Sequence, residues 1–246
     1  MTTTVITICL NSAATLERTI TSILQQSCKP SEYLFVDGGS SDATLAIIQN
    51  YLPLLQAAGI NGKILRQRLE PSAAGIPLAW NQGIAAADGD IIALLNSDDW
   101  YEPETIQIVQ QAFAAQPNCE GVICPVKFHS AGKVVKVFEA RSFLWLPVLM
   151  PVPHPGCFFR RSLYKRLGQY DTRYRVSADY DFIWRCRQKK VKLQKLPHAS
   201  VNMELGGLAN RNRELARNET YIIAKRHTNW LALPRIAWLL RTTFDR

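Results

Sequence analysis

The sequence predicts an α/β fold built on a mostly parallel sheet. Three observations lead to this prediction. Short apolar runs alternate with amphipathic stretches through the first half of the 246-residue chain, the order expected of a doubly wound sheet. Hydrophobic residues make up 47% and charged residues 20%, which is typical of a folded protein with a substantial core. No internal repeat or low-complexity linker divides the chain.

Four continuous apolar runs predict the parallel strands, because a strand covered on both faces carries no polar alternation. The expected strands are residues 5–10, 33–36, 63–69 and 91–96, the third being the weakest. Apolar residues at helical spacing predict a helix after each strand. These helices are expected near residues 16–24, over residues 42–55 with Ser41 as the cap, near residues 76–86, and from Pro103 onward.

In the second half of the chain, the regular alternation of predicted strands and helices ends. Residues 121–138 resemble an antiparallel hairpin with Gly132 in its turn. A further strand is expected over residues 156–161 and a helix over residues 177–190. The chain then becomes polar and arginine-rich. We expect one domain over residues 1–205 and a basic helical C-terminal extension over residues 206–246.

The net charge of +9 favours anionic partners: phosphorylated metabolites, nucleic acid or an anionic membrane face. Composition does not choose among them. The N-terminus has no basic leader, and no segment carries enough uninterrupted apolar residues to span a bilayer. Six scattered cysteines without a CxxC pair indicate reduced thiols in the cytosol more than disulfides, and zinc is not expected.

Polar side chains follow three of the predicted strands. Asn11 follows the first, Asp37 the second, and the pair Asp98 and Asp99 the fourth. Ligands of open α/β sheets gather beyond the carboxyl ends of the strands, and carboxylates there repel a phosphate unless a cation intervenes. Hard oxygen ligands suit Mg²⁺ or Mn²⁺. The simpler alternative is that the acid pair caps the helix near Pro103.

Four ordered segments carry a family resemblance: "VITICLNSAATLERTITSILQQS", "EYLFVDGGSSDAT", "GIPLAWNQGIAAADGDIIALLNSDDWYEP" and "HPGCFFRRSLYKRLGQYDTRYRVSADYDFIWRC". Together they resemble the inverting family-2 glycosyltransferases with the GT-A fold, of the bacterial cell-surface polysaccharide type. The resemblance covers residues 4 to about 207. It implies a Rossmann-like central sheet flanked by helices, with a nucleotide-binding half (1–100) and an acceptor half with a small antiparallel element (101–205).

The resemblance implies a role for each matching acid. Asp37 would bind the nucleotide base, usually a uracil imide, since a carboxylate only accepts hydrogen bonds. Asp99 would bind the metal, with Asp98 touching the ribose, the sugar or the ion. Asp179 would be the catalytic base. Ser97 stands where relatives often have another acid, which leaves one carboxylate fewer at the ion.

The implied reaction moves a sugar from a nucleotide-sugar, most often a UDP-sugar, to a saccharide or polyprenyl-linked acceptor. Inversion is one in-line displacement in which a base takes the acceptor proton while Mn²⁺ or Mg²⁺ neutralises the leaving diphosphate. Such an enzyme would work in the cytoplasm, at the inner face of the plasma membrane. Asp181, two residues beyond Asp179, would point elsewhere on the helix.

Other candidates have two interpretations each. Asn81 and Asp90 line the donor pocket in relatives, but Asp90 also fits a turn after a helix. His198 would be a third metal ligand or a structural residue, and His154 could approach the site. Arg160 and Arg161 would support phosphates or solvate a strand end. Gly206 and Gly207 would form a lid or a surface turn.

The C-terminal extension interleaves basic residues with tryptophan and leucine. This composition fits an interfacial helix on anionic lipid, or a helix that packs on the domain with a solvated basic face. The basic residues are Arg211, Arg213, Arg217, Lys225, Arg226, Arg235 and Arg241, and the apolar ones are Trp230, Trp238, Leu239 and Leu240.

Three other functions would each explain part of the sequence. A sugar-phosphate nucleotidyltransferase is expected to have a glycine-rich loop after the first strand, and "CLNSAATLERT" contains no glycine. A nucleic-acid-binding module would explain the net charge but not the acids at the sheet edge; we therefore expect no nucleic-acid partner. A catalytically inactive nucleotide-binding relative is disfavoured by the intact Asp37, Asp99 and Asp179.

Overall fold

The structure, a computed structural model, describes residues 1–68, 75–198, 201–204, 212–228 and 232–244. A seven-stranded sheet forms the centre, in the order β10-β6-β9-β4-β1-β2-β3. Its strands are β1 (Thr3–Cys9), β2 (Glu32–Asp37), β3 (Asn61–Arg66), β4 (Ile91–Leu94), β6 (Gly121–Ile123), β9 (Cys157–Arg160) and β10 (Leu193–Lys195). Only β9 among them runs antiparallel to its neighbours, β4 and β6.

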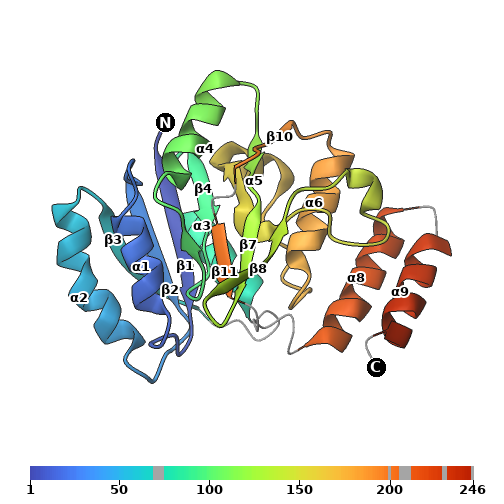
Figure 1. Cartoon of the computed structure of the whole chain (residues 1–246), viewed down its shortest axis with the longest axis horizontal. Helices are drawn as coiled ribbons and strands as arrows, with labels where there is room; N and C mark the ends of the chain where they lie inside the picture. Colours follow the sequence, from blue (N-terminus) through green and yellow to red (C-terminus); the bar gives the residue numbers. More distant parts are fainter. Residues whose placement is uncertain (69–74, 199–200, 205–211, 229–231, 245–246) are drawn as a thin grey trace.

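Helices cover both faces of this sheet (Figure 1). The side chains of one strand point alternately to the two faces, so β1 sends Val5 to one core cluster and Ile6 to the other. The first cluster contains residues of α1 (Leu16–Leu24), α2 (Thr44–Ala57) and α4 (Thr105–Ala115). The second contains residues of α3 (Ile76–Ala86), α5 (Arg161–Leu167) and α6 (Ala178–Gln188). The predicted α/β class and mostly parallel sheet are confirmed.

A second, four-stranded sheet has the order β5-β11-β7-β8. Its strands are β5 (Trp100–Tyr101), β11 (Val201–Glu204), β7 (Val126–Ser130) and β8 (Lys133–Phe138). The predicted hairpin over residues 121–138 is therefore partly wrong. Residues 121–123 join the central sheet as β6, and the hairpin proper begins after Pro125, which cannot donate a ladder hydrogen bond. Its turn has Ala131 and Gly132 at positive φ, 50° and 76°.

Two helices close the chain: α8 (Arg213–His227) packs against α6, and α9 (Ala232–Phe244) packs against α8. Figure 1 places them at the end of the molecule opposite α2. Ile223 and Ala224 of α8 belong to the core cluster that contains α6. The boundary at residue 205 stays a prediction. In the described ranges, no helix is long and apolar enough to cross a membrane.

Candidate active site at the carboxyl edge of the sheet

Three loops meet where β1, β2 and β4 end. These strands are parallel, so their carboxyl ends share one edge of the sheet. The hydroxyl of Ser12, after β1, lies 2.8 Å from that of Ser97, after β4. The backbone N–H of Ser12 donates to Thr44 Oγ1 at 2.8 Å, and that of Asn11 to Ser40 Oγ at 2.9 Å. The predicted convergence of these loops is thereby observed.

Asn11 shapes this edge through its backbone and its side chain. Its φ of 51° places it in the left-handed region, which asparagine tolerates better than most residues. Its side-chain oxygen accepts the N–H of Ser41 at 2.9 Å. Asn11 therefore ties the loop after β1 to the loop after β2.

Asp37 lies at the same edge but is 2% exposed. Its carboxylate accepts the N–H groups of Gly39 at 2.9 Å and Ser40 at 3.2 Å, an Asx-type turn. Beside it, a side chain on Gly38 would approach the amide oxygen of Gln67 to 3.1 Å. Gln67 follows β3 and thus joins the same edge. Sequence reasoning missed it because the strand before it is weak and carries no neighbouring acid.

The two acids after β4 have different environments. Asp98 is partly exposed, whereas Asp99 has no exposed surface. Asn96 donates to Asp99 Oδ2 at 3.0 Å, while Asp99 Oδ1 has no hydrogen-bond partner. Burial, and secondly the charge of Asp98, raises the pKa of Asp99 well above its usual range. Asp98 is thus the more accessible of the two carboxylates, and the metal role expected of Asp99 stays a prediction.

The donor set fits a divalent cation shared with a substrate. Among the residues that the structure describes, no three His, Cys, Asp or Glu side chains gather as a metal site. Mg²⁺ in such sites takes one or two protein carboxylates and completes its shell with water and phosphate oxygens. Asp98, with its hard oxygens at the edge, matches that pattern. His198 is exposed, just before residues 199–200, which lie outside the described ranges.

Asp179 begins α6, also at the carboxyl edge. It lies close enough to Cys157 to help raise the pKa of that thiol, and Cys157 opens β9 opposite Ile123, the last residue of β6. The Asp179 carboxylate accepts the N–H of Tyr180 at 2.7 Å. Burial raises its pKa to about 6, a value suited to a base near neutral pH.

Asp181 has a structural environment, as expected for the other face of the helix. Its carboxylate is 2.8 Å from Arg185 Nε and 2.9 Å from His227 Nε2. Arg185 in turn donates to the carbonyl of Gln169 at 2.8 Å. Asp181 therefore joins α6 to α8 and to the preceding loop.

Asn81 and His154 serve the packing between α3 and the loop before α6. The Asn81 amide donates to the carbonyl of Tyr170 at 2.8 Å and accepts its N–H at 2.9 Å. His154 is buried, its ring lies against Trp80 in a tilted arrangement with centroids 4.7 Å apart, and its Nε2 lies 2.9 Å from the Tyr170 hydroxyl. Burial lowers the pKa of His154 to about 4.

Asp90, Arg160 and Arg161 lie at the opposite, amino edge. Asp90 accepts the N–H of Thr2 at 2.9 Å. Because β9 is antiparallel, its last residues emerge beside the start of β4. Arg160 Nε donates to the Cys119 carbonyl at 2.6 Å, and Arg161 Nη1 to the Ala87 carbonyl at 3.0 Å. One of the two expectations for Arg160 and Arg161 is that they support the phosphates of the donor. This expectation is wrong, because both arginines lie at the edge of the sheet opposite Asp98.

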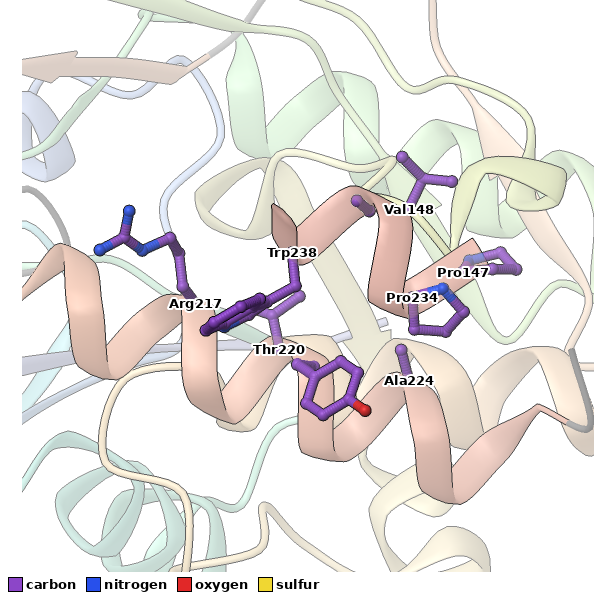
Figure 2. Close-up of a pocket in the computed structure, with 9 residues that line it drawn as sticks. Pro147, Val148, Arg217, Thr220, Ala224, Pro234 and Trp238 are labelled. Carbon is purple, nitrogen blue, oxygen red and sulfur yellow. The ribbon is translucent and has the colours of Figure 1, made fainter. Parts of the chain in front are cut away.

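Several candidates lie outside the described residues, namely Gly206, Gly207, Arg211 and Trp230. The side chains of Leu240 and Arg241 are likewise not described. Figure 2 shows a shallow pocket between α8, α9 and the turn at Pro147. Trp238 and Pro234 of α9 line it together with Thr220 and Ala224 of α8. No acid or histidine lines this pocket, and it is separate from the edge that carries Asp98.

Comparisons with known proteins agree with this geometry. The model of the family "Glycosyl transferase family 2" matches residues 4–168. A "PGL/p-HBAD biosynthesis glycosyltransferase" of Mycobacterium bovis (strain BCG / Pasteur 1173P2) is 32% identical over 213 residues, which cover 82% of this chain and 76% of that protein. An uncharacterized glycosyltransferase of Mycobacterium tuberculosis is 31% identical, covering 75% of this chain and 68% of the relative.

Two solved structures share the fold. TarS 1-349 of S. aureus, in complex with UDP-GlcNAc, superposes with a TM-score of 0.71 at 19% identity, covering 91% of this chain but only 64% of that one. The mannosyltransferase PcManGT from Pyrobaculum calidifontis, in complex with GDP-Man and Mn²⁺, gives 0.69 at 17% identity, covering 95% and 68%. The predicted GT-A fold and enzyme class, a nucleotide-sugar-dependent glycosyltransferase, are confirmed. The chain thus belongs to glycosyl transferase family 2.

Proposed function

We propose that this glycosyltransferase moves a sugar, with inversion, from a nucleotide-sugar, in the first place a UDP-sugar, to a hydroxyl of a saccharide or polyprenyl-linked acceptor. The observation that carries the proposal is the carboxyl edge itself. There the loops with Asp37 and Asp98 are joined through Ser12, and Asp179, with its pKa raised to about 6, begins α6. The complexes of TarS with UDP-GlcNAc and of PcManGT with GDP-Man and Mn²⁺ support it.

On the donor side, Asp37 fixes the turn that faces the nucleotide base. The neighbouring Gln67, whose Nε2 donates to the carbonyl of Gly75 at 3.1 Å, offers its amide oxygen to the N–H of a uracil edge. Asn11 holds the two loops in register. Asp98 would hold Mn²⁺ or Mg²⁺, whose chemistry is to neutralise the charge that develops on the leaving diphosphate. Asp99 is buried and accepts a hydrogen bond from Asn96, and its Oδ1, which has no hydrogen-bond partner, keeps it a candidate ligand of the same ion. His198 stays a candidate for a further ligand.

On the acceptor side, ionised Asp179 takes the proton of the attacking hydroxyl. The acceptor oxygen forms its bond to the anomeric carbon as the bond from that carbon to the diphosphate oxygen breaks. The anomeric configuration inverts because both changes occur in line. A correctly placed base contributes about 10²–10⁴-fold to turnover, which makes Asp179 the residue on which the rate depends most.

The C-terminal helices suit a lipid-linked acceptor. Ile222 on α8 and Ile236 and Leu239 on α9 are about half exposed, and Lys225, Arg226 and Arg235 stand near them in sequence. Exposed apolar side chains with adjacent positive charge bind anionic bilayers. We therefore propose peripheral contact with the inner face of the plasma membrane, and a cytoplasmic active site.

A donor screen tests the proposed function. The purified protein is incubated with UDP-, GDP- and dTDP-sugars and Mn²⁺ or Mg²⁺, and the released nucleotide is measured. In parallel, the bare nucleotides are tested for thermal stabilisation. We expect release from a UDP-sugar and stabilisation by UDP only with the metal present. Stabilisation by none of the nucleotides, with and without metal, would contradict the proposed donor site.

A further inference from the structure

The loop directly before Asp179 is held by a carboxylate from a distant helix. The first N–H groups of a helix and the residues leading into it need acceptors. Glu219 of α8 supplies three acceptor contacts to residues 175–177. Its Oε1 accepts the N–H of Arg175 at 2.7 Å, and its Oε2 accepts those of Val176 at 2.9 Å and Ser177 at 2.8 Å.

Glu219 is a buried acid, only 6% exposed, and a buried carboxylate is tolerated only where hydrogen bonds compensate its lost hydration. The three backbone donors meet this need. The Ser177 hydroxyl adds contacts to the same face of α8, at 3.3 Å from the carbonyl of Ala216 and 3.4 Å from Thr220 Oγ1. Without Glu219, three backbone donors would lose their acceptor at once.

A second contact joins α8 to α6 one turn beyond the loop. His227 lies 2.9 Å from the Asp181 carboxylate, and its ring stacks on Trp184 with centroids 5.7 Å apart and planes 10° apart. On another face of α8, Trp238 of α9 donates to the Asn218 side chain at 3.1 Å. The helix that carries Glu219 is thus fixed from two sides.

We propose that Glu219 is a positioning residue for the base: it fixes residues 175–177, and with them the place of Asp179 at the start of α6. This inference rests on the proposed function, in which Asp179 takes the acceptor proton. It assigns part of the active site to the C-terminal helix α8, outside the region that the family model matches.

The same carboxylate also acts on Asp179 through its charge. Burial is the main cause of the raised pKa of Asp179, and the negative charge of Glu219 adds to it. Two other titratable groups interact electrostatically with Asp179, namely Cys157 of β9 and Tyr170 of the preceding loop. Burial raises the pKa of both well above the usual range, so both are neutral near pH 7. Glu219 is therefore the charged neighbour that a substitution can remove.

Two substitutions of Glu219 test the proposal, with Glu214→Gln as the matched control, since Glu214 is an exposed acid on the same helix. In Glu219→Ala the loop loses its acceptor, and we expect kcat to fall by about 10–100-fold with the donor KM nearly unchanged. In Glu219→Gln one oxygen remains and the charge is gone. We expect a smaller loss and an acid limb of the kcat–pH profile that moves to lower pH. Glu214→Gln should change neither quantity.

The Glu219→Gln variant tests the proposal even if the Glu219→Ala variant does not fold. A folded Glu219→Gln protein with wild-type kcat and an unmoved acid limb would overturn it. In an Asp179→Asn background, Glu219→Gln should cause no further loss, because its effect passes through Asp179; an additive loss would count against us. Full turnover of Asp179→Asn alone would instead refute the base of the proposed function, so the two failures are distinguishable.

Discussion

The acidity of Asp179 follows from where the side chain lies. Its carboxylate has the N–H of Tyr180 as a hydrogen-bond donor, which favours the charged form, but burial disfavours that form more strongly and raises the pKa to about 6. A base of this pKa is ionised in a cell of neutral pH and still binds a proton well. The environment of Asp179 thus suits its carboxyl group to proton transfer rather than to a salt bridge.

This acidity predicts the pH dependence of turnover. Below pH 6 Asp179 is protonated and cannot accept the acceptor proton, so kcat should fall about tenfold for each further pH unit. Asp179→Asn should lower kcat by about 10²–10⁴-fold and leave the Kd of the nucleotide within a few-fold. Asp88→Asn, at the amino edge, is the control. An acid limb that persists in the residual activity of Asp179→Asn would assign it to another group.

Solvent exposure distinguishes the carboxylate of Asp98 from that of Asp99. Because Asp98 is the acid open to solvent, Asp98→Asn should weaken the metal-dependent stabilisation by UDP, measured as the shift in melting temperature during a Mn²⁺ titration. Asp99→Asn should raise the melting temperature without ligand, since it keeps an acceptor oxygen for Asn96 and removes a charge that burial disfavours. Equal weakening of Mn²⁺ dependence by both substitutions would show that the buried acid also reaches the ion.

The sequence locates the acid pair but not which of its members is exposed. Strand β4, whose side chains point alternately to the two faces of the sheet, ends at Leu94. The turn that follows sets the direction of the side chains of Asp98 and Asp99. Glu219 was missed because an acid on a basic helix resembles a solvated charge. A signal was present: Glu219 shares the helical stripe of Ala216 and Ile223, which faces the core.

At the level of elements, the boundaries of α3 were predicted to the residue, and β4 within two residues, because continuous apolar runs leave few alternatives. The direction of β9 was not predictable from its own four residues. It depends on which edge the chain reaches after the second sheet, a long-range property. Because β9 is antiparallel to β4, Arg160 and Arg161 lie at the amino edge of the sheet and Cys157 lies near Asp179.

The contact of α3 with β1 yields a stability prediction. A side chain on Gly83 would approach Ile6 Cγ2 to 2.5 Å and Val36 Cγ2 to 3.3 Å. Alanine improves helix propensity by about 1 kcal/mol, but overpacking a buried contact costs about 1–3 kcal/mol. We expect Gly83→Ala to lower the melting temperature, and Ile6→Ala in the same chain to remove part of that penalty. A melting temperature raised by Gly83→Ala alone would contradict this packing.

Across the whole molecule, charge and exposed apolar side chains coincide on the C-terminal helices. We expect the protein to float with anionic vesicles at low salt, since each basic residue near the surface contributes about 1 kcal/mol. Ile222→Glu should reduce flotation, while Val135→Glu, at an exposed valine of β8, should not. Absence of flotation at low salt, or equal loss in both variants, would contradict membrane contact through α8.

The carboxylate of Glu219 also has a consequence for biosynthesis. The loop that it completes lies 42 residues earlier in the chain at Ser177, so a ribosome must add the first half of α8, up to Glu219, before that loop gains its last acceptor. A growing polypeptide can assemble the nucleotide-side loops much sooner. During synthesis we therefore expect the loops on the donor side to form before the loop that positions Asp179 is complete.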